Sequence, residues 1–111
     1  MRAKSVVVGL LLLGLAPLSA SAQEIGNPYR GQAYARQLCS DCHSVERVAD
    51  KSPAAAAPAF ATVGKTSGMT AMALTAWMNT SHPTMPNLVV KGEKLDDIIA
   101  YILSIKDRPQ G

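Results

Sequence analysis

Residues 39–43 read Cys-Ser-Asp-Cys-His, and they hold the only two cysteines of the 111-residue chain. The cysteines lie three positions apart, so a helical backbone would place both thiols on one turn. A histidine follows the second cysteine directly. Four kinds of site use this cysteine spacing, and the rest of the sequence favours one of them.

The first 22 residues have the pattern of a secretory signal peptide. Two basic residues come first, an uncharged apolar run covers residues 6–16, and Ala20-Ser21-Ala22 has the small-x-small form of a cleavage site. The apolar run has 11 residues, whereas a membrane-spanning helix needs about 20. We therefore predict cleavage after Ala22 and a periplasmic location for residues 23–111, with no stable membrane insertion.

The predicted mature chain is a single small domain. Removing 22 of 111 residues leaves 89, too few for a second hydrophobic core. The removed segment carries two of the eleven basic residues and none of the eight acidic ones, so the mature formal charge is +1. This balance argues against a nucleic-acid-binding protein, which would show a clustered basic face. Because the chain has only five aromatic residues, we expect a crosslink or a large apolar group to complete its core.

Helical signals divide the rest of the chain, and no stretch alternates as a strand would. Asn27-Pro28 is a helix start, with Asn as N-cap and Pro in the first turn, and this helix leads into the cysteines. Thr70 is a second candidate N-cap. The segments predicted after the first helix are loop over 44–57, one short helical turn in 58–64, helix over 71–79 and an extended stretch over 81–87.

The last predicted helix runs from about residue 92 to residue 106. Its apolar residues follow the spacing of one helix face and are Leu95, Ile98, Ile99, Ile102 and Ile105. Asp96 and Asp97 are expected in the first turn and Lys106 in the last, where the helix dipole favours these charges. The predicted fold class is therefore all-α, with long loops between the helices.

Three of the four kinds of site that use two cysteines at this spacing fit the chain poorly. A disulfide would close a very short loop and add little stability. A redox dithiol of the thioredoxin type expects a βαβ context, and no strands are predicted. Structural zinc wants four ligands, whereas Cys39, Cys42, His43 and the distant His82 are all that is available.

Covalent haem attachment fits the remaining observations. A Cys-x-x-Cys-His sequence is the signature of c-type haem attachment. Cys39 and Cys42 would each form a thioether with one haem vinyl group, and His43 would be an axial ligand of the iron. Attachment requires export, and the signal peptide indicates export independently of the motif. We predict one covalently bound haem c.

Nearly all of residues 26–106 resembles the class I c-type cytochromes of bacteria, which are small single-haem proteins. Gly31 and Tyr101 match the glycine and the aromatic residue that pack together where the terminal helices of this family cross. Pro58 matches the loop proline whose carbonyl accepts the Nδ1 proton of the haem histidine. Met85-Pro86 matches the distal methionine and the proline that commonly follows it. The resemblance implies a cytochrome c fold for the mature chain.

The mature chain offers five side chains for the sixth coordination position of the iron: Met69, Met72, Met78, His82 and Met85. Met72 and Met78 share a predicted helix and suit the ordinary role of methionine in filling a core. Met69 is undecided, and His82 would give a bis-histidine haem. We favour Met85 because flanking prolines would hold it in a rigid segment, and because the family resemblance points to the same residue.

This ligand pair determines the expected function. With His43 and Met85 both bound, the iron would be six-coordinate and suited to passing single electrons. We expect a soluble, monomeric periplasmic electron carrier, not an enzyme, with redox proteins as donor and acceptor. The alternative is a dedicated electron-transfer subunit of a periplasmic dehydrogenase or reductase. A catalytic or gas-sensing haem is less favoured, because no distal histidine with a nearby arginine is evident.

Overall fold

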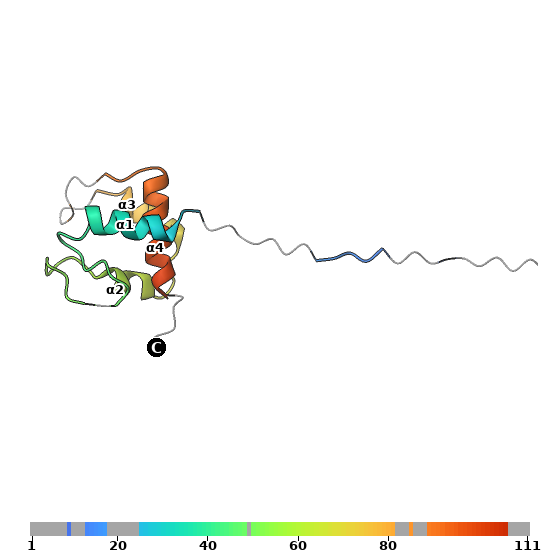
Figure 1. The fold of residues 1–111 in the computed structure, drawn as a ribbon, viewed down its shortest axis with the longest axis horizontal. Coiled ribbons are helices and arrows are strands. Elements are labelled where there is room, and N and C mark those ends of the chain that lie inside the picture. Colours follow the sequence, from blue (N-terminus) through green and yellow to red (C-terminus); the bar gives the residue numbers. More distant parts are fainter. Residues whose placement is uncertain are drawn as a thin grey trace, which may run out of the picture.

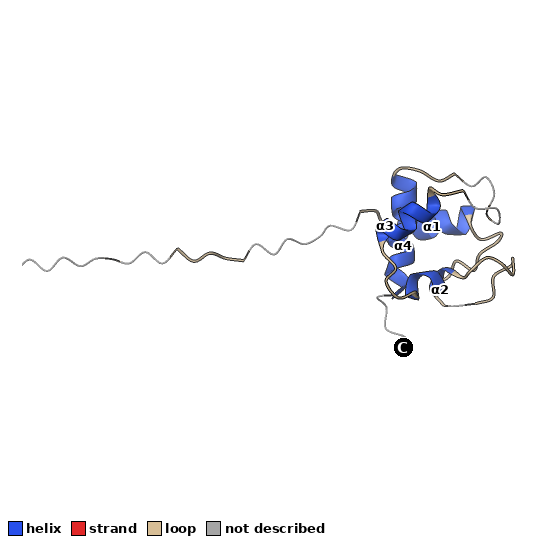
Figure 2. Ribbon diagram, turned by 180° about the vertical axis from the view of Figure 1, so that it is seen from behind, coloured by secondary structure: helices blue, strands red, loops and turns tan. Residues whose placement is uncertain are grey.

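Four helices form the described part of the protein and confirm the all-α class. The computed structural model describes residues 9, 13–17, 25–48, 50–81, 85 and 89–106. In these residues the helices are α1 (Pro28–Leu38), α2 (Phe60–Lys65), α3 (Ala71–Met78) and α4 (Glu93–Lys106), and no strand is present. Each of the first three packs against α4, as Figures 1 and 2 show from opposite sides. None of these helices has the length and apolar character needed to cross a bilayer.

The predicted helix starts are confirmed by their caps. The Asn27 side chain accepts hydrogen bonds from the backbone N–H groups of Tyr29 and Arg30, at 2.9 and 3.1 Å. The Thr70 hydroxyl accepts from the Ala73 N–H at 3.1 Å. Both side chains satisfy donors that a helix start leaves without an intrahelical partner. The helical turn predicted in residues 58–64 is α2.

Helix α4 is the centre of the core. All five residues of its predicted apolar face are buried. Tyr101, in the same helix, is completely inaccessible to solvent. Helix α1 approaches α4 so closely that a Cβ atom on Gly31 would collide with the carbonyl oxygen of Asp97 and lie 2.8 Å from the Tyr101 Cβ. Gly64 of α2 faces the Ile102 carbonyl in the same way. The predicted contact between Gly31 and Tyr101 at the helix crossing is confirmed.

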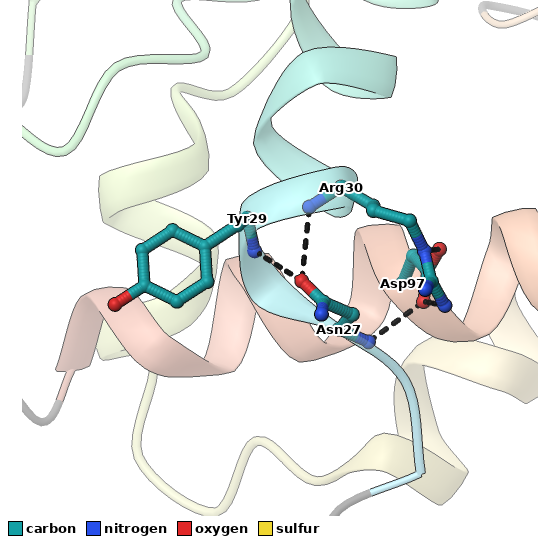
Figure 3. Close-up of polar contacts among 4 residues, drawn as sticks. All are labelled: Asn27, Tyr29, Arg30 and Asp97. Atoms are coloured by element: carbon teal, nitrogen blue, oxygen red, sulfur yellow. Dashed lines mark hydrogen bonds and ion pairs between the residues drawn. The ribbon is translucent and has the colours of Figure 1, made fainter.

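The prediction that Asp97 serves the dipole of α4 from its first turn is wrong. The acidic residues of that turn are Glu93 and Asp96, whereas Asp97 follows them and points into the interface with α1. Its side chain is 1% exposed and accepts from the Asn27 N–H at 2.6 Å and from the Arg30 guanidinium at 2.7 and 3.0 Å (Figure 3). A buried carboxylate needs such partners, and here they come from the start of α1.

The prediction that Met72 fills the core is wrong, whereas Met78 does pack against it. Helix α3 buries Leu74, and Met78 lies one helical turn further on the same side. Met72 falls on the other side and is 82% exposed.

Parts of the predicted signal segment and of the predicted extended stretch lie outside the described residues. Of the signal segment 1–22, only residues 9 and 13–17 are described, and of the extended stretch 81–87, only Ser81 and Met85.

Candidate cofactor site at the CSDCH motif

The motif forms one tight turn at the end of α1. Cys39 is the C-cap of the helix, and its carbonyl oxygen accepts from the N–H groups of Cys42 and His43, at 3.2 and 2.9 Å. The helical hydrogen-bonding pattern thus continues through the motif, and both sulfur atoms belong to the same turn. Cys39 is 6% exposed, Cys42 is exposed, and both are free thiols.

The burial of Cys39 bears on which chemistry its sulfur can support. Burial raises the pKa of the Cys39 thiol to about 11, because the charged thiolate loses its hydration there. The attacking cysteine of a reactive dithiol has a lowered pKa, so Cys39 itself does not suit that role. A neutral sulfur is favoured at this position, and a thioether is neutral.

The imidazole of His43 is held by the loop that follows the motif. Its Nδ1 lies 2.7 Å from the carbonyl oxygen of Pro58, and a carbonyl can only accept, so Nδ1 carries the proton and donates. The proton on Nδ1 leaves Nε2 with its lone pair, which is the form of histidine that binds metals. The hydrogen bond that the sequence resemblance implied between His43 and Pro58 is present.

The chain that follows the motif folds back onto Cys42 and onto Ser44, the residue after the motif. The Ala54 N–H donates to the Cys42 carbonyl at 3.0 Å, and the Phe60 N–H donates to the Ser44 carbonyl at 2.9 Å. The Phe60 ring packs against the His43 ring with the centroids 5.5 Å apart. Hydrogen bonds therefore hold the backbone on both sides of His43, and Phe60 packs against its ring.

Sequence reasoning missed two hydroxyl groups that act on the same segment. Ser52 accepts from the Ser44 N–H at 3.0 Å, and Tyr101 donates to the Val45 carbonyl at 2.6 Å. No local sequence pattern predicts either contact. Ser52 lies 8 positions from Ser44, and Tyr101 lies 56 positions from Val45.

The candidates for the sixth ligand are only partly located. Met85 is half-buried, Met69 and Met78 pack against the core, and His82 lies outside the described residues. Met72 lines a shallow groove with Ile25 and Asp96, near the start of α1, whereas the motif follows the end of that helix. Met85 as ligand stays a prediction.

The side chains at the motif are compatible with a covalently held haem. Over the described residues, no group of three or more His, Cys, Asp or Glu side chains is placed to hold a metal ion. Two free thiols on one turn and a histidine that donates from Nδ1 are compatible with two thioethers and one histidine ligand.

Neither the comparison with protein-family models nor the searches of curated proteins and of solved structures finds a match to this chain.

Proposed function

We propose that the protein is a periplasmic single-electron carrier that holds one haem c through Cys39, Cys42 and His43. The observation that carries the proposal is the hydrogen bond from His43 Nδ1 to the Pro58 carbonyl, next to two thiols on one helical turn. It prepares Nε2 as a metal ligand, and a histidine with no such role has no need of this arrangement directly behind two cysteines. The proposed fold is that of the class I c-type cytochromes.

Each residue of the motif has a distinct part in the proposal. The Cys39 and Cys42 thiols would hold the haem as two thioethers, since addition of each S–H across a vinyl group forms the C–S bond, places the proton on the other vinyl carbon and needs no oxidant. His43 supplies Nε2 as one axial ligand, while Pro58 fixes the plane and tautomer of the ring. Met85 is proposed to supply the opposite ligand through its thioether.

When bound, the haem supplies the change between ferrous and ferric iron. The chain's own residues provide ligands, orientation and exclusion of water. A methionine ligand raises the reduction potential relative to a second histidine, and a filled sixth position closes the iron to small ligands. The exposure of Cys42 against the burial of Cys39 gives the proposed site one solvent-facing side.

Mass spectrometry of the exported protein tests the proposal. We expect a chain beginning at Gln23 with the added mass of one haem, retained after denaturation and acid–acetone extraction. Cys42→Ala should leave a single thioether and change the reduced absorption spectrum, whereas Asp41→Asn, in the same turn, should leave the spectrum unchanged. A mature chain without haem, or one that releases haem to acid–acetone, would contradict the proposal.

A further inference from the structure

The backbone directly after His43 is tied to three separate parts of the protein. The Ser44 N–H donates to the Ser52 hydroxyl, the Ser44 carbonyl accepts from Phe60 at the start of α2, and the Val45 carbonyl accepts from Tyr101 in α4. Three polar main-chain groups of Ser44 and Val45 are therefore held, two of them by side-chain hydroxyls.

The Tyr101 contact is the stronger of the two side-chain contacts. Tyr101 is completely buried, Val45 is 5% exposed, and their hydrogen bond measures 2.6 Å. Burial raises the pKa of the Tyr101 hydroxyl, so it stays protonated and continues to donate. Its ring lies 6.4 Å from that of Phe60, the same ring that packs on His43.

Tyr101 is also fixed from the other side. It meets Gly31 at the crossing of α1 and α4, and the Arg47 guanidinium lies 5.1 Å from its ring centre. Arg47 donates to the Ser104 hydroxyl at 3.1 Å as well. The hydroxyl that holds Val45 therefore belongs to a side chain that is packed on several sides.

We infer that the hydroxyl groups of Tyr101 and Ser52 are positioning groups for His43. They hold the peptide that follows His43 so that its imidazole keeps the correct distance to the Pro58 carbonyl and continues to donate from Nδ1. The inference rests on the proposed function only in giving this orientation a purpose, since the hydrogen bonds themselves belong to the protein chain.

Exchange of the His43 Nδ1 proton with water tests the inference. It is measured by NMR on exported protein labelled with ¹⁵N-histidine, in a His82→Gln background where His43 is the only histidine. Because one intramolecular hydrogen bond is lost in each case, Tyr101→Phe and Ser52→Ala should each speed exchange roughly three- to tenfold. Ser52→Thr keeps a hydroxyl and should restore the original rate.

Two control variants separate positioning from general stability. Gln32→Ala removes a donor that reaches the same phenolic oxygen at 3.4 Å without affecting Val45, and it should leave exchange unchanged. Leu74→Ala opens a cavity in the α3 contact and should lower the unfolding temperature without speeding exchange under conditions where the protein is folded. If Leu74→Ala speeds exchange as much as Tyr101→Phe, the effect is one of stability and the inference is wrong.

The reduction potential gives a second readout in the haem-loaded protein. A weaker hydrogen bond from Nδ1 makes the imidazole a poorer donor to ferric iron, so Tyr101→Phe and Ser52→Ala should raise the potential and Leu74→Ala should not. Unchanged exchange in both hydroxyl variants would overturn the inference. A wild-type protein without haem would instead refute the proposed function, and the exchange comparison would still decide the role of the two hydroxyls.

Discussion

The two ends of α1 lie in different kinds of environment. Near its start, Gly31 contacts the backbone of α4, and the buried Asp97 receives hydrogen bonds from Asn27 and Arg30. At its end, Cys42 is exposed and His43 is half-exposed, although hydrogen bonds fix the orientation of the histidine. The first region is closed by contacts between protein atoms, and in our proposal the second region holds the haem.

The difference separates residues that serve the stability of the helix crossing from residues that serve the proposed cofactor site. The helix crossing depends on the absence of a side chain at Gly31 and on one ion pair whose carboxylate is buried, so altering it should change stability first. The motif turn depends on sulfur and imidazole chemistry, so altering it should change the proposed cofactor first. Four predictions test this separation, from the largest expected effect to the smallest.

Replacing both Cys39 and Cys42 by alanine should have the largest effect. In our proposal the haem supplies much of the core of a short chain, so the crossing of α1 and α4 should not be stable without it. The variant, expressed without residues 1–22, should show no cooperative thermal unfolding by circular dichroism. Asp41→Asn in the exported protein should keep both haem and cooperativity. Cooperative unfolding of the haem-free variant would mean that the crossing is independent of the motif.

Met85→Ala should change the redox properties while the chain remains folded. Removing the proposed sulfur ligand should lower the reduction potential and let carbon monoxide bind to the reduced protein. It should also abolish the near-infrared sulfur-to-iron charge-transfer band of the oxidised protein.

The other methionines are the controls for Met85. Met72→Leu changes an exposed side chain, and Met78→Leu conserves volume at the edge of the core, so both should keep the band. If the band survives in Met85→Ala and disappears in Met69→Leu, the ligand is Met69.

Gly31→Val should destabilise the crossing by about 1–3 kcal/mol, since the added side chain must displace the backbone of α4. The measurement is the denaturation midpoint in urea. Ala33→Val is the matched control, because Ala33 lies on the exposed side of the same helix and should cost only a few tenths of a kcal/mol, roughly the difference in helix propensity. Equal losses in the two variants would show that propensity, and not the close approach, sets the cost.

Local signals in the sequence were sufficient to predict the helices and the motif turn. Asn27 and Thr70 act on N–H groups two or three residues ahead of them, and the apolar face of α4 repeats within single turns. The His43–Pro58 hydrogen bond spans 15 residues and was anticipated only through the family resemblance.

Contacts between distant segments could not be predicted in the same way. Asp97 looks like an ordinary residue of a first helical turn, and only the packing of α1 places Arg30, 67 positions away, against it. Met72 and Met78 differ by a rotation about α3 that their shared residue type does not reveal. The hydroxyls of Ser52 and Tyr101 bind backbone atoms, and nearly every residue type has a backbone N–H and a carbonyl, so the residue type of the partner does not indicate these contacts.

The smallest predicted effect is a difference in acid sensitivity between two ion pairs. The Arg30 guanidinium holds the pKa of the Asp97 carboxyl below its ordinary value, against burial, and the Asn27 N–H acts in the same direction. Arg36 likewise lowers the pKa of Glu46, but that carboxylate is 52% exposed and its hydrogen bonds compete with water. In both pairs the pKa of the carboxyl group is lowered, but the Asp97 carboxylate is buried and the Glu46 carboxylate is exposed.

A lowered pKa in the folded state stabilises the protein only while the carboxylate is ionised. The contribution of Asp97 is complete above the ordinary aspartate pKa of about 3.9 and is lost as the pH falls through the lower folded-state value. Asp97→Asn should reduce stability at neutral pH and make the free energy of unfolding fall less steeply in acid than that of the wild type. Glu46→Gln should flatten the slope much less, because water competes for the hydrogen bonds of that exposed carboxylate. Urea unfolding at several pH values below 5 measures both. If Glu46→Gln flattens the slope as much as Asp97→Asn, burial at the helix crossing gives Asp97 no special weight.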